Sequence, residues 1–223
     1  MTAQYESPKT PAIGQNSTAI WQTSTGWESV GLAVALTVAC IVGRLWLDQP
    51  NFKPSMAAAI LAGMALHQWR LAVFVPLFSA IVTDMFLGTY ELPLMIAVYA
   101  CSVLPVFWFR VVEAVRIFGD HGSQPRAMAV RLGLDLGMMN LGAVVAAVVF
   151  YGVTSFVVWS ATPWYPAGME GLTQAYWNAI PFLRWMVQGN LVFLNALAAA
   201  WLAYRALSML AVRANDAQPV LPQ

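Results

Sequence analysis

The sequence predicts an all-α integral membrane protein with six transmembrane helices. Of its 223 residues, 60% are hydrophobic and only 9% are charged, whereas soluble domains contain about 25% charged residues. The apolar residues also form long runs, and runs of about 18 or more are typical of membrane spans. The net charge of +1 provides no basic surface of the kind that binds nucleic acid.

Polar stretches at both ends bound the predicted membrane domain. Residues 1–28 are rich in Ser, Thr, Gln and Pro, with no apolar segment directly after a basic patch. We therefore interpret them as a disordered N-terminal tail and not as a signal peptide. The six-helix transmembrane domain is expected over 29–212, and a short C-terminal tail over 213–223.

Each span is predicted from an apolar run bounded by Pro, Gly, aromatic or charged residues. The second run is short and opens with Pro54, a residue type favoured in the first turn of a helix. A loop is expected from Arg110 to Arg131, and residues 160–183 contain too many prolines and turn residues to span. The six predicted spans are 29–47, 54–68, 71–88, 92–109, 132–153 and 185–210.

The distribution of basic residues predicts that both termini are cytoplasmic. Six spans place the two tails on one side together with the second and fourth loops. Because cytoplasmic loops carry an excess of Lys and Arg, the side with more basic residues is predicted to be cytoplasmic. That side holds Lys9, Arg70, Arg110, Arg116, Arg126, Arg131, Arg205 and Arg213; the other holds Arg44, Lys53 and Arg184.

With this orientation, three segments face outward and form the predicted ligand site: 48–54, 84–91 and 159–183. They contain many aromatic residues and several prolines. Trp and Tyr can simply anchor a protein at the membrane interface, but stiff aromatic loops with a few polar groups also suit a binding pocket. The candidate ligand-binding residues are Asn51, Phe52, Asp84, Tyr90, Trp159, Trp164, Tyr165 and Asn178.

Three charged residues within or beside apolar runs have a functional and a structural interpretation. Asp84 either contacts a ligand inside the bundle or reaches headgroup water at a helix end. Arg44 either extends to the interface, pairs with Asp48 four residues on, or binds an anionic substrate. Asp135 lies four residues after Arg131, and a pair between them explains it without a function.

The first span carries a series of small residues at intervals of four: Gly31, Ala35, Ala39 and Gly43. Small side chains let membrane helices approach closely. The series therefore serves either packing within the bundle or docking of a separate membrane subunit.

No catalytic or cofactor motif is present. The chain lacks a phosphate-binding loop, a paired-histidine helix motif and a nucleophile elbow. The two cysteines, Cys40 and Cys101, lie in apolar runs without further Cys or His at ligand spacing, which favours small core residues over a disulfide or a metal site. We expect no enzymatic activity, no cofactor and no metal.

Several short motifs resemble a family of uncharacterised bacterial multi-pass membrane proteins over about residues 35–200. That family in turn resembles the substrate-binding (S) components of energy-coupling factor (ECF) transporters. The motifs are Asn51-Phe52-x-Pro54, Pro76-Leu77, Asp84, Gly88, Thr154-Ser155-Phe156-Val157-Val158-Trp159, Tyr165-Pro166, Gly171-Leu172, Pro181-Phe182 and Gly189-Asn190.

The resemblance implies a multi-pass protein of the bacterial inner membrane that binds a small solute and captures it from the external side. It also implies a partner, a transmembrane coupling subunit with its ATPases, docked on the small residues of the first helix. Two alternatives stay open on the residues alone. One is a structural or assembly protein without a ligand, and the other is a membrane enzyme acting on a lipid.

Overall fold

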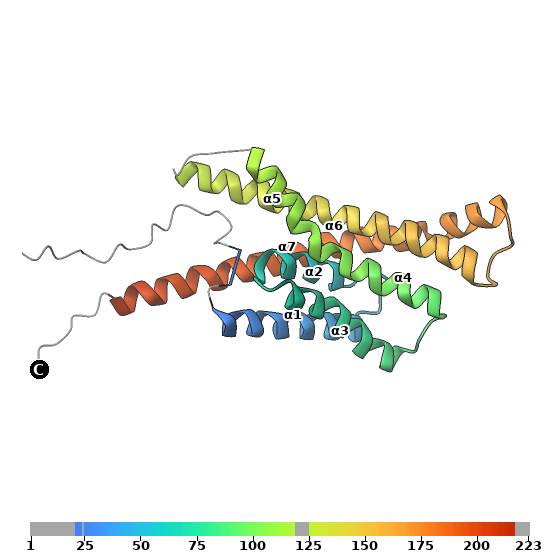
Figure 1. Ribbon diagram of the computed structural model, residues 1–223, viewed down its shortest axis with the longest axis horizontal. Helices are drawn as coiled ribbons and strands as arrows, with labels where there is room; N and C mark the ends of the chain where they lie inside the picture. The colour runs from blue at the N-terminus through green and yellow to red at the C-terminus, as the bar shows by residue number, and fades with distance from the viewer. Residues whose placement is uncertain (1–20, 24, 119–124, 217–223) are drawn as a thin grey trace, which may run out of the picture.

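The computed structural model describes residues 21–23, 25–118 and 125–216. Over these ranges the chain forms helices joined by short turns and no β-strand, which confirms the all-α prediction. The elements, shown in Figure 1, are α1 (Gly26–Trp46), α2 (Ser55–Ala65), α3 (Trp69–Leu87), α4 (Leu92–Val103), the 3-10 helix η2 (Leu104–Phe107), α5 (Trp108–Phe118), α6 (Pro125–Ala161) and α7 (Met169–Asp216).

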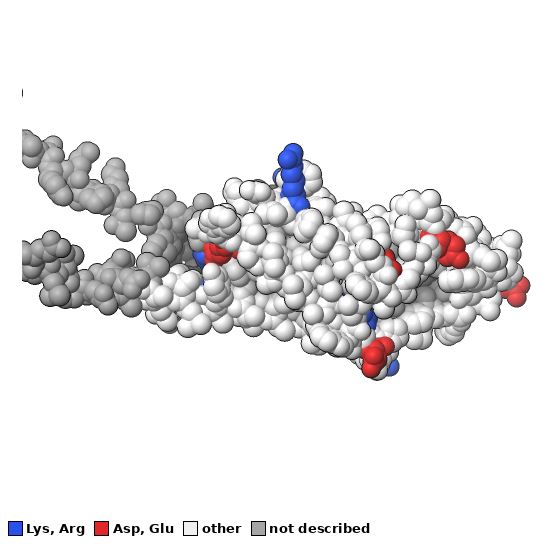
Figure 2. Space-filling view, turned by 90° about the horizontal axis from the view of Figure 1, so that it is seen from below, with Lys and Arg blue, Asp and Glu red and all other residues white. Residues whose placement is uncertain are grey.

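Five helical stretches are long and apolar enough to cross a membrane, which confirms a multi-pass helical membrane protein. They are Gly26–Trp46, Trp69–Leu87, Leu92–Val115, Ala129–Ala161 and Met169–Ala211. Figure 2 shows that one face of the molecule is mostly uncharged, as expected for a surface in contact with lipid.

The sixth predicted span is a short central helix. The 11 residues of α2 rise only about 16 Å at 1.5 Å per residue, against a hydrocarbon layer of about 30 Å. Every residue from Met56 to Ala65 is buried, and α2 touches all the other helices. A helix that is apolar on all sides belongs in the core of a bundle.

The loop before α2 also packs between the helices of the bundle, so it continues the buried segment that α2 forms. Pro54 lies against Gly43 of α1, where a Cβ would come within 2.6 Å of the proline ring. The backbone of Phe52 lies against Gly189 of α7, at 3.0 Å from a notional Cβ. Irregular backbone at such depth is tolerated where protein surrounds it.

We call the two ends of the molecule the loop end and the terminal end. The loop end carries the connections 47–54, 88–91 and 162–168. The terminal end carries the turn 66–68, the start of α1 and the end of α7 (Figure 1). Figure 2 shows most of its visible acidic side chains towards the loop end, on the right.

The predicted loop from Arg110 to Arg131 is wrong at both of its ends. After η2, α5 continues to Phe118, and α6 begins at Pro125. The chain changes from α to 3-10 geometry at Pro105, which has no N–H to donate to the carbonyl of Cys101. The helix therefore is interrupted inside the predicted fourth span and continues beyond it.

The predicted loop over 160–183 is also wrong. α6 extends to Ala161, the connection covers only 162–168, and α7 begins at Met169 with Pro181 inside it. In Figure 1 the α6–α7 hairpin extends beyond the loop ends of α3 and α4. Gly168 has a φ of 95°, a conformation that glycine adopts without steric cost.

The boundaries of the predicted tails also differ from the structure. α1 begins at Gly26, where the Thr25 side chain caps the backbone N–H of Glu28 at 3.1 Å. Trp21 is 1% exposed, its indole donates to Asp135 at 2.9 Å and its carbonyl accepts from Trp201 at 3.0 Å. Residues 1–20 and 217–223 lie outside the described residues, and α7 continues to Asp216.

Candidate ligand-binding site

Two adjoining chambers at the loop end form what we call the loop-end cavity. The first chamber has a volume of about 250 Å³ and lies between α1–α4, α6 and α7. The second has about 230 Å³ and lies between α6 and α7 of the hairpin. Both chambers share four lining residues, which shows that they adjoin: Asn51, Phe150, Thr154 and Met186.

The first chamber combines a polar wall with an apolar one. Its apolar lining comes from Met56, Pro76, Ala80, Leu94, Val98, Phe150 and Met186. Its polar lining comes from Arg44, Asn51, Lys53, Ser55, Tyr90, Ser102, Thr154 and Asn190. A mostly apolar cavity with a few convergent polar groups is the usual form of a small-molecule site.

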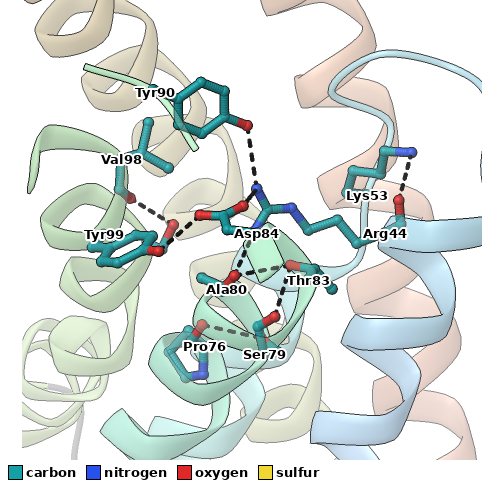
Figure 3. A network of polar contacts seen from close by, with 11 residues as sticks. Arg44, Lys53, Pro76, Ser79, Ala80, Thr83, Asp84, Tyr90, Val98 and Tyr99 are labelled. Carbon is teal, nitrogen blue, oxygen red and sulfur yellow. Dashed lines mark hydrogen bonds and ion pairs between the residues drawn. The ribbon is translucent and has the colours of Figure 1, made fainter. Parts of the chain in front are cut away.

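A buried ion pair supports the polar wall (Figure 3). The Arg44 Nη2 donates to Asp84 Oδ1 at 2.7 Å, and the Tyr99 hydroxyl donates to Asp84 Oδ2 at 2.8 Å. The Asp84 side chain is 2% exposed and that of Arg44 is 15% exposed. Asp84 therefore lies behind Arg44, and of this ion pair only the guanidinium reaches the chamber.

Further contacts fix the orientation of the Arg44 guanidinium. Its Nη1 donates to the Ala80 carbonyl at 3.4 Å, and the Tyr90 hydroxyl lies 3.5 Å from Nη2. Of the three alternatives for Arg44, the structure does not contain the pair with Asp48, because the salt bridge of Arg44 runs to Asp84 on α3. Two helices far apart in sequence thus hold one charge at the chamber wall.

Lys53 provides a second cation at the chamber wall, and its amine also binds backbone carbonyls at the C-terminal end of α1. Its Nζ donates to the carbonyls of Leu47 and Arg44, the latter at 3.5 Å. A cation is favourable there because the C-terminal carbonyls of a helix lack partners and carry partial negative charge. Burial first, and then the nearby charge of Arg44, lower the pKa of the Lys53 amine, while Asp48 opposes them.

The second chamber has aromatic walls and hydroxyl groups. Trp164 and Tyr165 from the 162–168 connection line it, together with Tyr151, Ser155 and Asn178 from the two helices. Asn178 Nδ2 donates to the Tyr165 hydroxyl at 3.5 Å. The connection therefore forms the outer boundary of this chamber.

Asn190 is an amide at the base of the first chamber. It is 1% exposed, and its Nδ2 donates to the Ala143 carbonyl at 3.0 Å and to the Met56 sulfur at 3.4 Å. These contacts tie α7 to α6 and α2 at the level where the loop backbone meets Gly189. The residue thus fixes helix spacing and presents a polar group to the cavity.

The structure brings five of the eight predicted site residues to the loop-end cavity: Asn51, Tyr90, Trp164, Tyr165 and Asn178. Asp84 contacts it only through Arg44. Phe52 lines neither chamber and packs with Trp185 and Phe193. Trp159 also lines neither, since its indole donates to the Pro166 carbonyl at 3.2 Å and its ring contacts Phe156.

The prediction did not include Lys53, Phe150, Met186 or Asn190. An asparagine inside the long apolar run of α7 was the available signal for Asn190, because amides are costly in lipid unless they are bonded. Phe150 and Met186 carry no signal in the sequence, since apolar residues that line a cavity look the same as those that fill a core.

The small-residue series of α1 divides between two environments. Gly31 and Ala35 line an open groove of about 630 Å³ between α1 and α7, which we call the α1–α7 groove. Gly43 packs against Pro54, and Ala39 is partly buried. The groove is largely apolar, and Trp201 and Ala200 of α7 line its far side.

A comparison with protein families identifies the chain. A family model described as a family of unknown function matches residues 25–211. The chain belongs to this family, DUF6580. No curated protein and no solved structure matches this DUF6580 member. Its described residues contain no group of three or more His, Cys, Asp or Glu that could hold a metal ion.

Proposed function

We propose that this membrane protein binds a small solute in the loop-end cavity, entering from the side of the membrane that the 162–168 connection faces. The observation that carries the proposal is the lining itself. An oriented guanidinium, the amides of Asn51 and Asn190, and the aromatic rings of the second chamber converge on one cavity. Such a lining suits an amphipathic solute with an apolar body and polar substituents.

The size of the chambers limits the ligand. Volumes of about 250 and 230 Å³ lie just below the range of about 300–1,000 Å³ typical of ligand pockets. A compact solute would occupy one chamber, and a longer one would extend past Asn51 and Met186 into both.

The charge distribution supports an external position for this cavity. Arg70 and Arg110 lie at the terminal end, as do Arg131 near the start of α6 and Arg205 near the end of α7. An excess of basic residues is characteristic of the cytoplasmic side. We therefore place the terminal end in the cytoplasm and the loop end outside, in a bacterial cell membrane.

Transport of the solute would require a partner, for which the α1–α7 groove is the proposed docking surface. Gly31, Ala35 and Ala200 leave room at its walls, and small residues allow close helix approach in lipid. By the resemblance to ECF S components, the occupant would be a transmembrane helix of a coupling subunit that carries the ATPases.

The same groove favours a second candidate function, an assembly protein that holds other membrane subunits and binds no solute. The two candidates differ in the loop-end cavity, which only the first one uses. Saturable binding at that cavity therefore decides between them.

The test measures thermal shifts of the purified protein across a panel of vitamins, amino acids and metal ions, with two tryptophan variants. Trp164→Ala removes a wall of the second chamber and should weaken binding at least about tenfold, as loss of an aromatic anchor does. Trp177→Ala is the control, because Trp177 is on the same hairpin, is 73% exposed and lines neither chamber. Absence of any saturable shift in the unmodified protein would favour the assembly function.

A further inference from the structure

A second cavity opens at the terminal end of the bundle, and we call it the terminal-end cavity. Its volume is about 310 Å³. The charged and polar part of its lining includes His67, Arg110 and Glu113, and its aromatic part includes Trp21, Trp69 and Phe109. It thus offers a polar and aromatic lining at the end of the molecule opposite the loop-end cavity.

The two cavities approach each other to within about one helical turn. On α3, Pro76 lines the first chamber and Ala72 lines the terminal-end cavity. On the α4–η2 segment, Ser102 lines the first chamber and Val106 lines the terminal-end cavity. Four residues of helix correspond to about 6 Å along its axis, so the layer between the cavities is thin.

Part of the layer comes from α2. Met56 lines the first chamber and Gly63 lines the terminal-end cavity. Residues seven apart share a helix face, and Ile60 lies on that face between them. Gly63 contacts Val106 so closely that a Cβ would overlap the Val106 carbonyl oxygen. Ile60, which is 1% exposed, and the close Gly63–Val106 contact therefore belong to the layer between the two cavities.

Both elements that face α2 at this layer contain a proline there, within the continuous helix α3 and at the start of η2. Pro76 leaves the carbonyl of Ala72 without its helical donor, and Pro105 does the same for the carbonyl of Cys101. From Leu104 to Phe107 the chain has 3-10 geometry. Helices bend at such interruptions, and a short 3-10 stretch inside a helix often marks a hinge.

We propose that the loop-end and terminal-end cavities are two ends of one solute path through this chain, closed by the Gly63–Val106 contact and Ile60. Movement of η2 away from α2 opens the path. The amphipathic linings at both ends suit the same class of solute. Discontinuous helices that line a solute cavity are characteristic of transport proteins, and the α4–η2–α5 segment is such a helix. That a solute uses this path rests on the proposed function, whereas the existence of the path can be tested without any solute.

The test uses a membrane-impermeant cationic methanethiosulfonate reagent on sealed vesicles of either orientation. The reporter is Ser102→Cys on the loop-end side of the layer, in full-length protein that also carries Cys40→Ala and Cys101→Ala. With the path closed, the reporter should react from the loop-end side and only slowly from the terminal-end side. Adding Gly63→Ala forces η2 away from α2 and should raise the terminal-end rate about tenfold or more.

Gly142→Ala is the control for overpacking. A Cβ there comes within 2.5 Å of the Trp108 ring, but neither Gly142 nor Trp108 lines a cavity at the layer. This variant should leave the terminal-end rate unchanged. A folded Gly63→Ala protein with the unmodified rate would overturn the proposal.

A second pair of variants opens the layer by removing atoms, in case Gly63→Ala does not fold. Ile60 and Leu61 are adjacent, and both are 1% exposed. Ile60 faces the layer, whereas Leu61 lines the α1–α7 groove. Ile60→Ala should raise the terminal-end rate and Leu61→Ala should not; equal rates in the two variants would overturn the proposal. Solute binding is measured in a separate experiment. If no solute binds, the proposed function fails, but the labelling rates still test the path.

Discussion

Asp84 lies among apolar residues, and its contacts explain how the chain keeps a carboxylate there. An acid at the centre of a bilayer costs about 2.5–3.5 kcal/mol on insertion scales. Asp84 accepts hydrogen bonds from Arg44 and Tyr99 and is buried within the bundle. Asp84 therefore neither reaches headgroup water nor lines the loop-end cavity, and it acts by holding Arg44 in place.

We expect Asp84→Asn to destabilise the protein by about 3 kcal/mol, because it leaves the Arg44 charge without its partner in a low-dielectric environment. The measurement is thermal unfolding of the purified protein in detergent. Asp48→Asn is the control, since Asp48 is an exposed acid on the adjacent loop. Equal melting temperatures for the two variants would contradict a structural role of the ion pair.

Part of the site could be predicted at the residue scale. Charges within apolar runs are conspicuous, so Arg44 and Asp84 were both noted from the sequence. Their pairing was not, because sequence spacing identifies only neighbours on one helix, and Asp48 was the nearest acid to Arg44. The true partner is forty residues away on α3.

At the scale of the element, the small residues of α1 do two different things. No atom lies within 4 Å of a Cβ placed on Gly31, whereas Gly43 is filled by Pro54. The four-residue interval alone does not distinguish these environments. The half of the series towards the loop end packs the bundle, and the half towards the terminal end remains open.

This division predicts opposite effects for the same substitution. Gly43→Leu should destabilise the protein by about 1–3 kcal/mol, the usual effect of overpacking, while Gly31→Leu should leave its stability in detergent unchanged. Thermal unfolding of the two variants is compared under identical conditions. Loss of stability in both would show that another part of the protein occupies the groove.

The largest errors at this scale concern α6 and α7. Prolines and aromatic residues over 160–183 suggested a loop, but a single internal proline is tolerated in a helix when neighbouring elements compensate for the lost hydrogen bond. Hydrogen bonds between the helices stabilise the hairpin, since Tyr176 donates to the Gly152 carbonyl at 2.7 Å and Tyr151 to the Tyr176 carbonyl at 2.9 Å. Such pairing is tertiary and is not encoded in local composition.

The start of α1 shows the same limitation. The polar composition of residues 1–28 favoured a disordered tail, yet Trp21 contacts both α6 and α7, and the Thr23 N–H donates to the Ala65 carbonyl at 2.9 Å. One aromatic residue with two specific partners outweighs the composition around it. Deep burial of a large side chain contributes several kcal/mol in itself.

At the scale of the whole molecule, the bundle is organised around α2. Hydropathy correctly predicted an apolar segment at 54–68, but it does not distinguish a helix that faces lipid from one that other helices surround. Five long helices enclose the short one, and the loop before it carries Asn51 and Lys53 to the cavity. The position of the loop-end cavity therefore follows from the shortness of α2.

The two ends of the bundle should face opposite sides of the membrane, and cysteine labelling in intact cells tests this. Ala167 on the 162–168 connection and His67 on the 66–68 turn are both exposed, whereas Cys40 and Cys101 are buried. Because the basic residues gather at the terminal end, an impermeant maleimide should label Ala167→Cys from outside and His67→Cys only after the membrane is permeabilised.

The reverse pattern would place the loop-end cavity in the cytoplasm, so that a solute would be captured from inside. The apolar helix α3, 19 residues long, runs from the turn that contains His67 to the loop end. Labelling of both positions from one side would therefore contradict the membrane-spanning arrangement.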